Sequence, residues 1–232
     1  MMRPSFTFKY IEEQYTTAIA QGYQVITCEQ YVEMKDYGLP EKVIINRVDI
    51  DFSVKKAERL LDIFERLGIK GTFFIRLHAK EYNPFSFESY RIIKRIKSLG
   101  HEIGYHSEIV DQAAIWEEDA AKCLRKDIAV INSLYDISIG GVASHGGMTG
   151  LNNLAFWKNH HAEEFGLKYE AYDFFNDGFY VSDSEWTQWK SYDRGVLNSN
   201  DHRSLAEHAQ NHHNIIYALI HSDTYYDRHI YE

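Results

Sequence analysis

The stretch from Val43 to Ser53 reads VIINRVDIDFS, and the rest of the chain can be arranged around it. Its first residues are β-branched and apolar and follow a Gly-Leu-Pro turn signal, which predicts a buried strand. Because side chains alternate along a strand, Arg47, Asp49 and Asp51 leave the same face. A buried carboxylate is costly unless a cation or a metal partners it, so two at one strand end indicate a site. The alternative is an aspartate that caps the following helix with Arg47 as its counter-ion, which explains only one of the two.

Strand and helix patterns alternate along most of the chain. From the strand at 43–49 the pattern predicts a helix from Ser53 to Gly68, a strand at 71–75, a helix at 90–99, a strand at 101–106, a helix at 113–134 and a strand at 137–145. The last third predicts a helix at 151–165, strands at 167–171 and 178–181, a helix at 204–212 and a strand at 214–220. This alternation is typical of a parallel α/β fold, and it favours a barrel over an open sheet.

The composition indicates one acidic globular domain. The chain has 232 residues, 44% of them hydrophobic, and its net charge of −9 includes no basic block, which argues against nucleic acid as a partner. We see no apolar signal core and no run that could span a membrane, so we expect a cytoplasmic protein. Cys28 and Cys123 lack metal-ligand spacing, which argues against a disulfide framework or a thiolate zinc site. We expect a single domain over 1–232, with a core at 43–221 and a helix and strand in 1–40 packed on it.

Residues that can bind a metal or move a proton follow several of the predicted strands. They are Asp49, Asp51, His106, His145 and His221. In a barrel of parallel strands these ends form one rim, where such folds build their active sites. A histidine taken alone is more often a surface or core residue, so the shared position is what makes these residues candidates.

Five segments resemble, in order and spacing, the motifs of the polysaccharide deacetylase family, the chitooligosaccharide-deacetylase-like carbohydrate esterase family four. They are RVDID at 47–51, GTFF at 71–74, GHEIGYHSE at 100–108, GVASHGG at 141–147 and IH at 220–221. The most specific of these motifs is GHEIGYH at 100–106, in which the residue before the final histidine is variable. The resemblance implies a distorted (β/α) barrel, here with about seven strands. It also implies hydrolysis of N- or O-acetyl groups on sugars with a divalent metal, usually zinc, held by one aspartate and two histidines.

Matching positions in these motifs imply roles for individual residues. Asp49 matches the catalytic base and His106 the first metal histidine. Asp51 matches the metal aspartate, although the family usually has two adjacent aspartates and here one residue intervenes. His221 matches the histidine that protonates the leaving group, and Asp183 lies in a segment similar to the motif that supports it.

The second metal histidine of the family falls at a position that here is Val110. Glu108 or His145 is then the leading candidate for the third metal ligand, with Asp111 as a further one. A mixed set of carboxylate and imidazole ligands still suits zinc, with manganese, iron, cobalt and nickel as alternatives.

Segment 141–147 also lacks the arginine that the family places near the base. Candidates for contact with the substrate are Arg47, Asp183, Trp186 and Trp189, with Tyr82 and Tyr105 as further aromatic residues. Any one of these aromatic side chains is more often a core residue than a sugar platform.

We therefore expect a metal-dependent hydrolase that deacetylates a sugar or glycan intermediate, in cytoplasmic biosynthesis of a surface polysaccharide. One alternative is a catalytically inactive, glycan-binding relative that keeps the barrel. Another is a metal amidohydrolase that acts on a non-sugar amide. Metal content separates the first alternative from an enzyme, because a binding module has little need of the ion.

Overall fold

The computed structural model describes residues 5–228 and has a mixed α/β fold around one largely parallel sheet. The two ends of the predicted domain, 1–4 and 229–232, lie outside the described residues. The first half of the chain forms α1 (Phe8–Ala20), β1 (Gln24–Ile26), α2 (Cys28–Met34), β2 (Val43–Ile50), α3 (Val54–Leu67), β3 (Thr72–Ile75), α4 (Phe87–Ser98), β4 (Glu102–Ser107) and α5 (Ile109–Trp116). The second half forms α6 (Ala120–Tyr135), β5 (Gly141–Ser144), η1 (Asn153–Lys158), η2 (Ala162–Phe165), β6 (Tyr169–Glu170), β7 (Phe179–Ser182), β8 (Lys190–Asp193), β9 (Val196–Asn198), α7 (Leu205–Gln210), β10 (Ile215–His221) and η3 (Ser222–Thr224).

The sheet has ten strands in the order β6-β5-β4-β3-β2-β10-β7-β8-β9, with β1 paired to β2 as well. β1 pairs with the first part of β2 and β3 with the second part, so these two strands share one edge of β2. All pairings are parallel except the two that join β7, β8 and β9. Among the described residues no pairing joins β6 to β9, so the sheet has two ends and more strands than the seven-stranded barrel that the sequence predicts.

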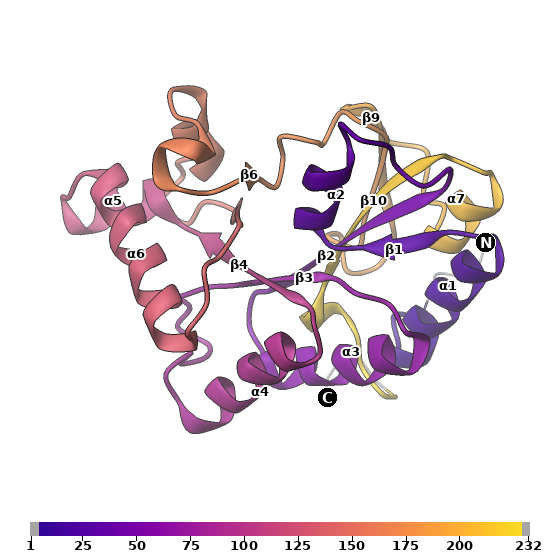
Figure 1. Cartoon of the computed structure of the whole chain (residues 1–232), viewed down its shortest axis with the longest axis horizontal. Helices are drawn as coiled ribbons and strands as arrows, with labels where there is room; N and C mark the ends of the chain where they lie inside the picture. The colour runs from indigo at the N-terminus through magenta and orange to yellow at the C-terminus, as the bar shows by residue number, and fades with distance from the viewer. Residues whose placement is uncertain (1–4, 229–232) are drawn as a thin grey trace.

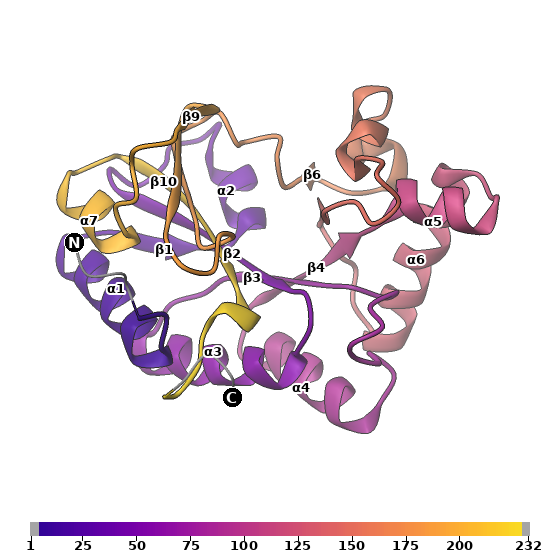
Figure 2. The same cartoon turned by 180° about the vertical axis from the view of Figure 1, so that it is seen from behind.

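The two faces of β2 show how the sheet is packed. Ile44, Val48 and Ile50 belong to the core under the helices, whereas Val43 and Ile45 face an inner cluster that α2 covers. In Figures 1 and 2, α3 and α4 lie side by side below the sheet and α2 lies above it. The inner face of β2 is thus apolar at its start, and Arg47 and Asp49 follow on that same face.

Helix α3 shows why these elements form where they do. The Ser53 hydroxyl accepts a hydrogen bond from the amide of Lys56 and so caps the helix, which therefore needs neither aspartate as its cap. Gly68, in the left-handed region at φ 66°, ends the helix. Leu60 and Phe64 are fully buried between these ends, and each contributes about 1.5–3 kcal/mol by burial.

Four regions differ from the sequence-based expectations, and one of them is the unpredicted hairpin of β8 and β9. The helix predicted over 113–134 is two helices, because Glu117 takes a left-handed conformation and Asp119 caps α6 anew. The helix predicted over 151–165 is two short 3-10 turns, η1 and η2. Helix α2 was not predicted, although Thr27 and Gln30 form a capping box at its start.

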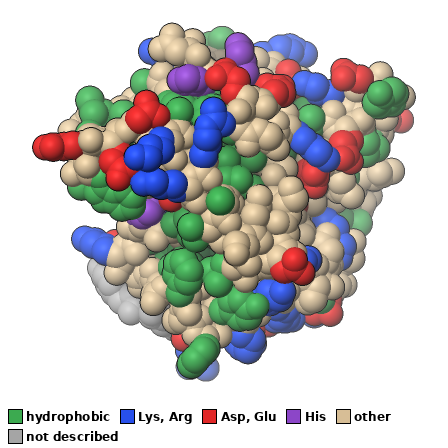
Figure 3. Space-filling view, turned by 60° about the vertical axis from the view of Figure 1, so that its left-hand side comes forward, with side chains coloured by type: hydrophobic (Ala, Val, Ile, Leu, Met, Phe, Trp, Pro, Cys, Tyr) green, Lys and Arg blue, Asp and Glu red, His purple; other side chains and the backbone are tan. Residues whose placement is uncertain are grey.

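Acidic and basic side chains are mixed on the face seen in Figure 3, where no broad area of one charge forms. Over the range 5–228, no helix has both the length and the apolar character that crossing a membrane requires.

Candidate functional site

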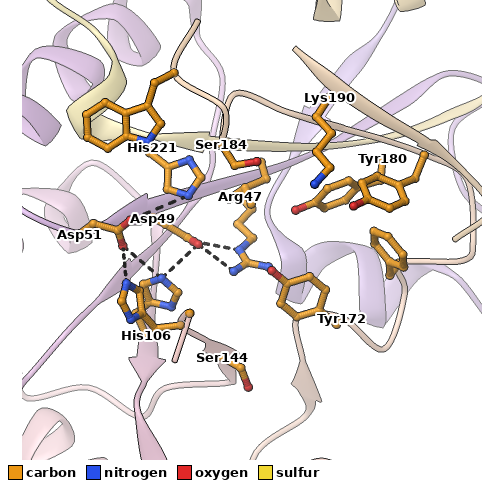
Figure 4. Close-up of a pocket in the computed structure, with 16 residues that line it drawn as sticks. Arg47, Asp49, Asp51, His106, Ser144, Tyr172, Tyr180, Ser184, Lys190 and His221 are labelled. Carbon is orange, nitrogen blue, oxygen red and sulfur yellow. Dashed lines mark hydrogen bonds and ion pairs between the residues drawn. The ribbon is translucent and has the colours of Figure 1, made fainter. Parts of the chain in front are cut away.

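A pocket of about 360 Å³ lies at the carboxyl ends of the central strands, within the size range of small-molecule sites (Figure 4). Its lining includes Asp49, Asp51, His106, His145 and His221, which the sequence places after separate strands. The strand register brings them together. Parallel pairing places His221 of β10 beside Asp49 of β2. It also places His106 of β4 beside Ala143 of β5, two residues before His145.

Asp51, His106 and His145 form a group that could hold a metal ion, with one ligand atom from each lying within 4.8 Å of the others. Asp51 Oδ1 lies 3.3 Å from His106 Nε2 and 3.7 Å from His145 Nε2. Four ligands placed tetrahedrally at zinc distances lie about 3.4 Å apart, so the spacing fits such an ion. Asp51 Oδ1 is buried and has no hydrogen-bond partner in the described chain. A buried carboxylate oxygen of this kind is suited to bind a cation.

The orientation of His106 also fits metal binding. Its Nδ1 lies 2.9 Å from the backbone oxygen of Ala143, and a carbonyl oxygen only accepts, so Nδ1 carries the proton of that bond. Nε2 therefore faces the pocket, as in metal-binding histidines whose other nitrogen is fixed by an acceptor. Burial acts to lower the pKa of His106, but the negative charges of Asp49 and Asp51 outweigh it and raise the pKa.

Asp49 is held by an arginine from its own strand. Arg47 Nε donates to Asp49 Oδ1 at 2.8 Å and Nη2 donates to Oδ2 at 2.7 Å, with both side chains almost fully buried. Burial acts to raise the pKa of Asp49, yet the charges of Arg47 and His106 hold it below its ordinary value. Segment 141–147 lacks an arginine near the expected base, and Arg47 supplies that cation instead. The Arg47–Asp49 pair stays in its ionised form.

His221 is held by Asp183. The imidazole Nδ1 lies 2.6 Å from Asp183 Oδ1, and the backbone amide of His221 also donates to this carboxylate. Nε2 points to the other side, 3.9 Å from Asp51 Oδ2. Burial acts to lower the pKa of His221. The charge of Asp183 outweighs burial and, with smaller effects from Asp49 and Asp51, raises this pKa to about 9.

Glu108 lies behind His145. Its carboxylate accepts two hydrogen bonds from Arg76, at 3.2 and 2.7 Å, and Oε1 lies 3.4 Å from His145 Nδ1. Arg76 also donates to the backbone oxygen of Asp51 at 2.8 Å. Glu108 is therefore placed to orient His145, and it does not belong to the three-residue group that could hold the metal.

Asp111 accepts hydrogen bonds from the amides of Met148 and Thr149 and from the Asn153 side chain. It therefore anchors the loop that follows His145.

The aromatic residues divide between the pocket and the core. Trp186 lines the pocket. Trp189, an expected substrate contact, instead lies in the core, where it is fully buried and its indole nitrogen donates to the hydroxyl of Tyr10 at 2.8 Å. Tyr105 is fully buried and Tyr82 is partly buried against the core, and neither lines the pocket.

Other pocket residues were missed in the sequence. They are Ser144, Tyr172, Phe175, Tyr180, Ser184, Lys190, Tyr192 and Leu219. Lys190 and Tyr192 come from β8, which pairs with β7 so that Lys190 lies opposite Ser182 and Tyr192 opposite Tyr180. Alternate residues of such a hairpin share a face, and the spacing of Lys190 and Tyr192 was the available signal.

No family model matches this sequence, and a search of curated proteins finds no match. Among solved structures, a Streptococcus pyogenes deacetylase, PplD, in complex with acetate is similar, with a TM-score of 0.45 and 13% sequence identity. The likeness covers 57% of this chain and 59% of that one, so less than two thirds of the other protein is matched. We therefore base the functional proposal on this chain's own residues.

Proposed function

We propose that this chain is a metal-dependent hydrolase that removes an acetyl group from an N- or O-acetylated sugar. One observation carries the proposal, namely that the pocket joins three kinds of group. A set of Asp51, His106 and His145 suits a cation, Asp49 is held ionised by an arginine, and His221 is oriented by an aspartate. Hydrolysis of an unreactive acetyl group needs these three functions, and a binding module needs none of them.

Zinc fits one carboxylate and two imidazoles, and manganese, iron, cobalt and nickel accept similar ligands. When bound, such an ion would act as a Lewis acid that polarises the acetyl carbonyl and acidifies water. Asp51, His106 and His145 would hold it.

The remaining residues move protons. Asp49 takes a proton from the attacking water, and Arg47 fixes both of its oxygens so that the carboxylate stays in one orientation. His221 gives a proton from Nε2 to the departing nitrogen or oxygen, because Asp183 occupies Nδ1 and turns Nε2 toward the pocket. The proton acceptor and the proton donor thus lie beside each other on paired strands.

Metal analysis and acetate release test the proposal together. We expect about one zinc or similar ion per wild-type chain and much less in His106→Ala and His145→Ala. His160→Ala is the matched control, because this histidine pairs with Glu164 outside the pocket. Acetate should be released from acetylated amino sugars or sugar esters by the wild type.

Equal metal content in all variants would remove the histidines from the metal site. A wild type that binds metal without releasing acetate from any sugar would favour an inactive relative, and cleavage of non-sugar amides alone would favour the amidohydrolase.

A further inference from the structure

The pocket extends beyond the proposed metal and proton-transfer groups, on the far side of Arg47 in Figure 4. We call this part the tyrosine lobe, and its residues are Tyr172, Tyr180, Lys190 and Tyr192. The proposed hydrolysis uses none of them. The lobe therefore has to be explained by something other than the acetyl group.

Lys190 brings an uncompensated positive charge to the tyrosine lobe. In the described part of the chain it forms no ion pair, and its ammonium lies 5.5 Å from the ring centre of Tyr192. Among the described residues, the acidic ones that line the pocket are Asp49 and Asp51. Asp49 is bound by Arg47, and Asp51 faces His106. Neither carboxylate is therefore left to neutralise Lys190.

Arg47 adds a hydrogen-bond donor behind the same lobe, although its charge is paired with Asp49. Its guanidinium carbon lies 4.7 Å from the ring centre of Tyr172. Two of its nitrogens hold Asp49, but Nη1 is buried and makes no hydrogen bond within residues 5–228. The phenol of Tyr217 lies close enough for Arg47 to act to lower its pKa, and its hydroxyl donates to the backbone oxygen of Ala171. A buried donor without an acceptor is rare unless a ligand supplies one nearby.

The tyrosines supply hydroxyl groups rather than more charge. Tyr180 is only 5% exposed and lines the pocket, where its hydroxyl lies beside that of Tyr172. Burial raises the pKa of Tyr180 well above its ordinary value, so the phenol keeps its proton and can donate it. Figure 4 shows the Lys190 side chain pointing toward the phenol groups beside Tyr180. A cation and phenol donors thus face one volume.

We propose that the tyrosine lobe binds an anionic group of the substrate, a carboxylate or a phosphate, so that the enzyme acts on acidic acetylated sugars. The proposal rests on the proposed function for the placement of the acetyl group beside Asp51, His106 and His145. Lys190 and the phenols would bind the anion's oxygens directly. Arg47 Nη1 would offer a further N–H behind Tyr172. A neutral sugar would leave Lys190 desolvated without a partner, which makes the lobe selective.

Binding measured without turnover tests the lobe separately from catalysis. The probes are N-acetylglucosamine, its 6-phosphate, and the corresponding N-acetylated uronic acid with its uncharged uronamide. Calorimetry in a metal-loaded His221→Gln background, which keeps the proposed metal ligands and lacks the proposed proton donor, should show tighter binding of at least one anionic probe than of its neutral counterpart. In Lys190→Met that preference should fall about tenfold or more, the usual worth of a hydrogen bond to a charged group. Lys190→Arg should restore part of it.

Lys80→Met is the matched control, because this lysine is 91% exposed and lies outside the pocket, and it should keep the full preference. The phosphate and carboxylate probes distinguish the two sources of the anion. Equal binding of charged and neutral probes, or no binding of any anionic probe, would overturn the anionic site. An unchanged preference in Lys190→Met would overturn the role of Lys190.

The two proposals fail in different ways. Anionic sugars that bind through Lys190 but release no acetate would keep the anionic site and refute the deacetylase. Efficient acetate release from a neutral sugar, with no preference for its acidic form, would keep the deacetylase and refute the anionic site.

Discussion

Two buried groups of carboxylates lie at opposite ends of β4, and the protein neutralises them in different ways. At the carboxyl end, Asp49 and Asp51 face His106 of β4 together with Arg47. At the amino end, Glu102 begins the same strand. We call these the carboxyl-end cluster (Arg47, Asp49, Asp51, His106) and the amino-end cluster (Glu102, Thr72, Tyr169 and the start of α2).

Glu102 has only neutral donors around it. Thr72 Oγ1 donates at 2.5 Å, the backbone amide of Glu29 donates at 2.9 Å, and the Tyr169 hydroxyl donates as well. Burial outweighs these hydrogen bonds and raises the pKa of Glu102 to about 7. The pKa of Asp49 is lowered instead, because a full positive charge stands beside it.

The difference separates a structural role from a chemical one. The amino-end cluster attaches α2 to the sheet, since the amides of Cys28 and Glu29 donate to Thr72 and Glu102. Gly141 allows Tyr169 to reach it, because a Cβ at residue 141 would lie 2.0 Å from the tyrosine ring. This attachment works whether or not Glu102 is ionised. In the proposed function the carboxyl-end cluster has to stay ionised to bind a metal and accept a proton, and it contains cations that lower the pKa values of Asp49 and Asp51.

The largest effect is expected where the carboxyl-end cluster is broken. Asp49→Asn should retain the metal but lower turnover by roughly a hundred to ten thousandfold, the usual worth of a positioned general base. Asp51→Asn should lose both metal and activity, because it removes a ligand. Elemental analysis and acetate release measure the two effects. An active Asp49→Asn would place the base elsewhere, and a metal-free Asp49→Asn would make Asp49 a ligand.

Much of the fold could be predicted because its central strands are short apolar runs with clear boundaries. β2 begins at Val43 as expected, and Ser53 and Gly68 bound α3. The β8–β9 hairpin was missed because it is polar and lies at the edge of the sheet, where β9 is exposed throughout. Its turn has Arg194 at φ 44° and Gly195 at φ 79°, and arginine is a weak signal for such a turn.

The sequence could predict only those site residues that a local pattern, such as the end of a strand, identifies. Strand ends identify Asp49, His106 and His221 as candidates, but Glu108 and His145 are equally plausible ligands in the sequence. In the structure Arg76 binds Glu108, whereas His145 joins Asp51 and His106, and this separates the two. Lys190 was missed because its spacing from Tyr192 indicates only a shared strand face, and the pairing of β7 with β8 that brings this face to the pocket is not evident in the sequence.

A second prediction tests the amino-end cluster through pH. The pKa of Glu102 is about 7 in the folded protein against 4.5 ordinarily, so the unfolded chain releases this proton first as pH rises. The contribution of Glu102 to stability is therefore full below pH 4.5 and lost above about 7. Relative to Glu102→Gln, the wild type should lose up to about 3 kcal/mol of unfolding free energy across this interval.

Urea unfolding of both proteins over this pH range measures that difference, and Glu41→Gln at an exposed position is the control.

In the metal-free protein, the pH dependence of stability relative to Asp49→Asn should have the opposite sign. The wild type should lose stability as pH falls below the ordinary aspartate pKa of 3.8. Parallel pH profiles for wild type and Glu102→Gln would show that Glu102 titrates normally.

A third prediction concerns the support of the carboxyl-end cluster. Glu108→Gln should weaken metal binding about tenfold to a hundredfold, as loss of a group that orients a metal-binding histidine usually does. The change keeps the shape of Glu108 but removes the charge opposite Arg76 and His145. Glu164→Gln alters the exposed pair with His160 and should leave metal affinity unchanged. Complete loss of metal in Glu108→Gln would instead make Glu108 a ligand.

The smallest effect is expected for Tyr169→Phe, which removes one donor from the amino-end cluster and leaves the ring in place. The cost should be about 1 kcal/mol of unfolding free energy, and it should grow as pH rises past the Glu102 pKa, because an ionised carboxylate needs its donors more. Tyr135→Phe is the matched control. Its hydroxyl donates to the backbone oxygen of Pro84, a neutral acceptor, so its cost should not vary with pH. Metal content should be unchanged in both variants, since Tyr169 and Tyr135 lie outside the pocket. If the two variants show the same pH-independent cost, the Tyr169 hydroxyl does not respond to the ionisation of Glu102. If Tyr169→Phe loses metal, the two ends of β4 are coupled.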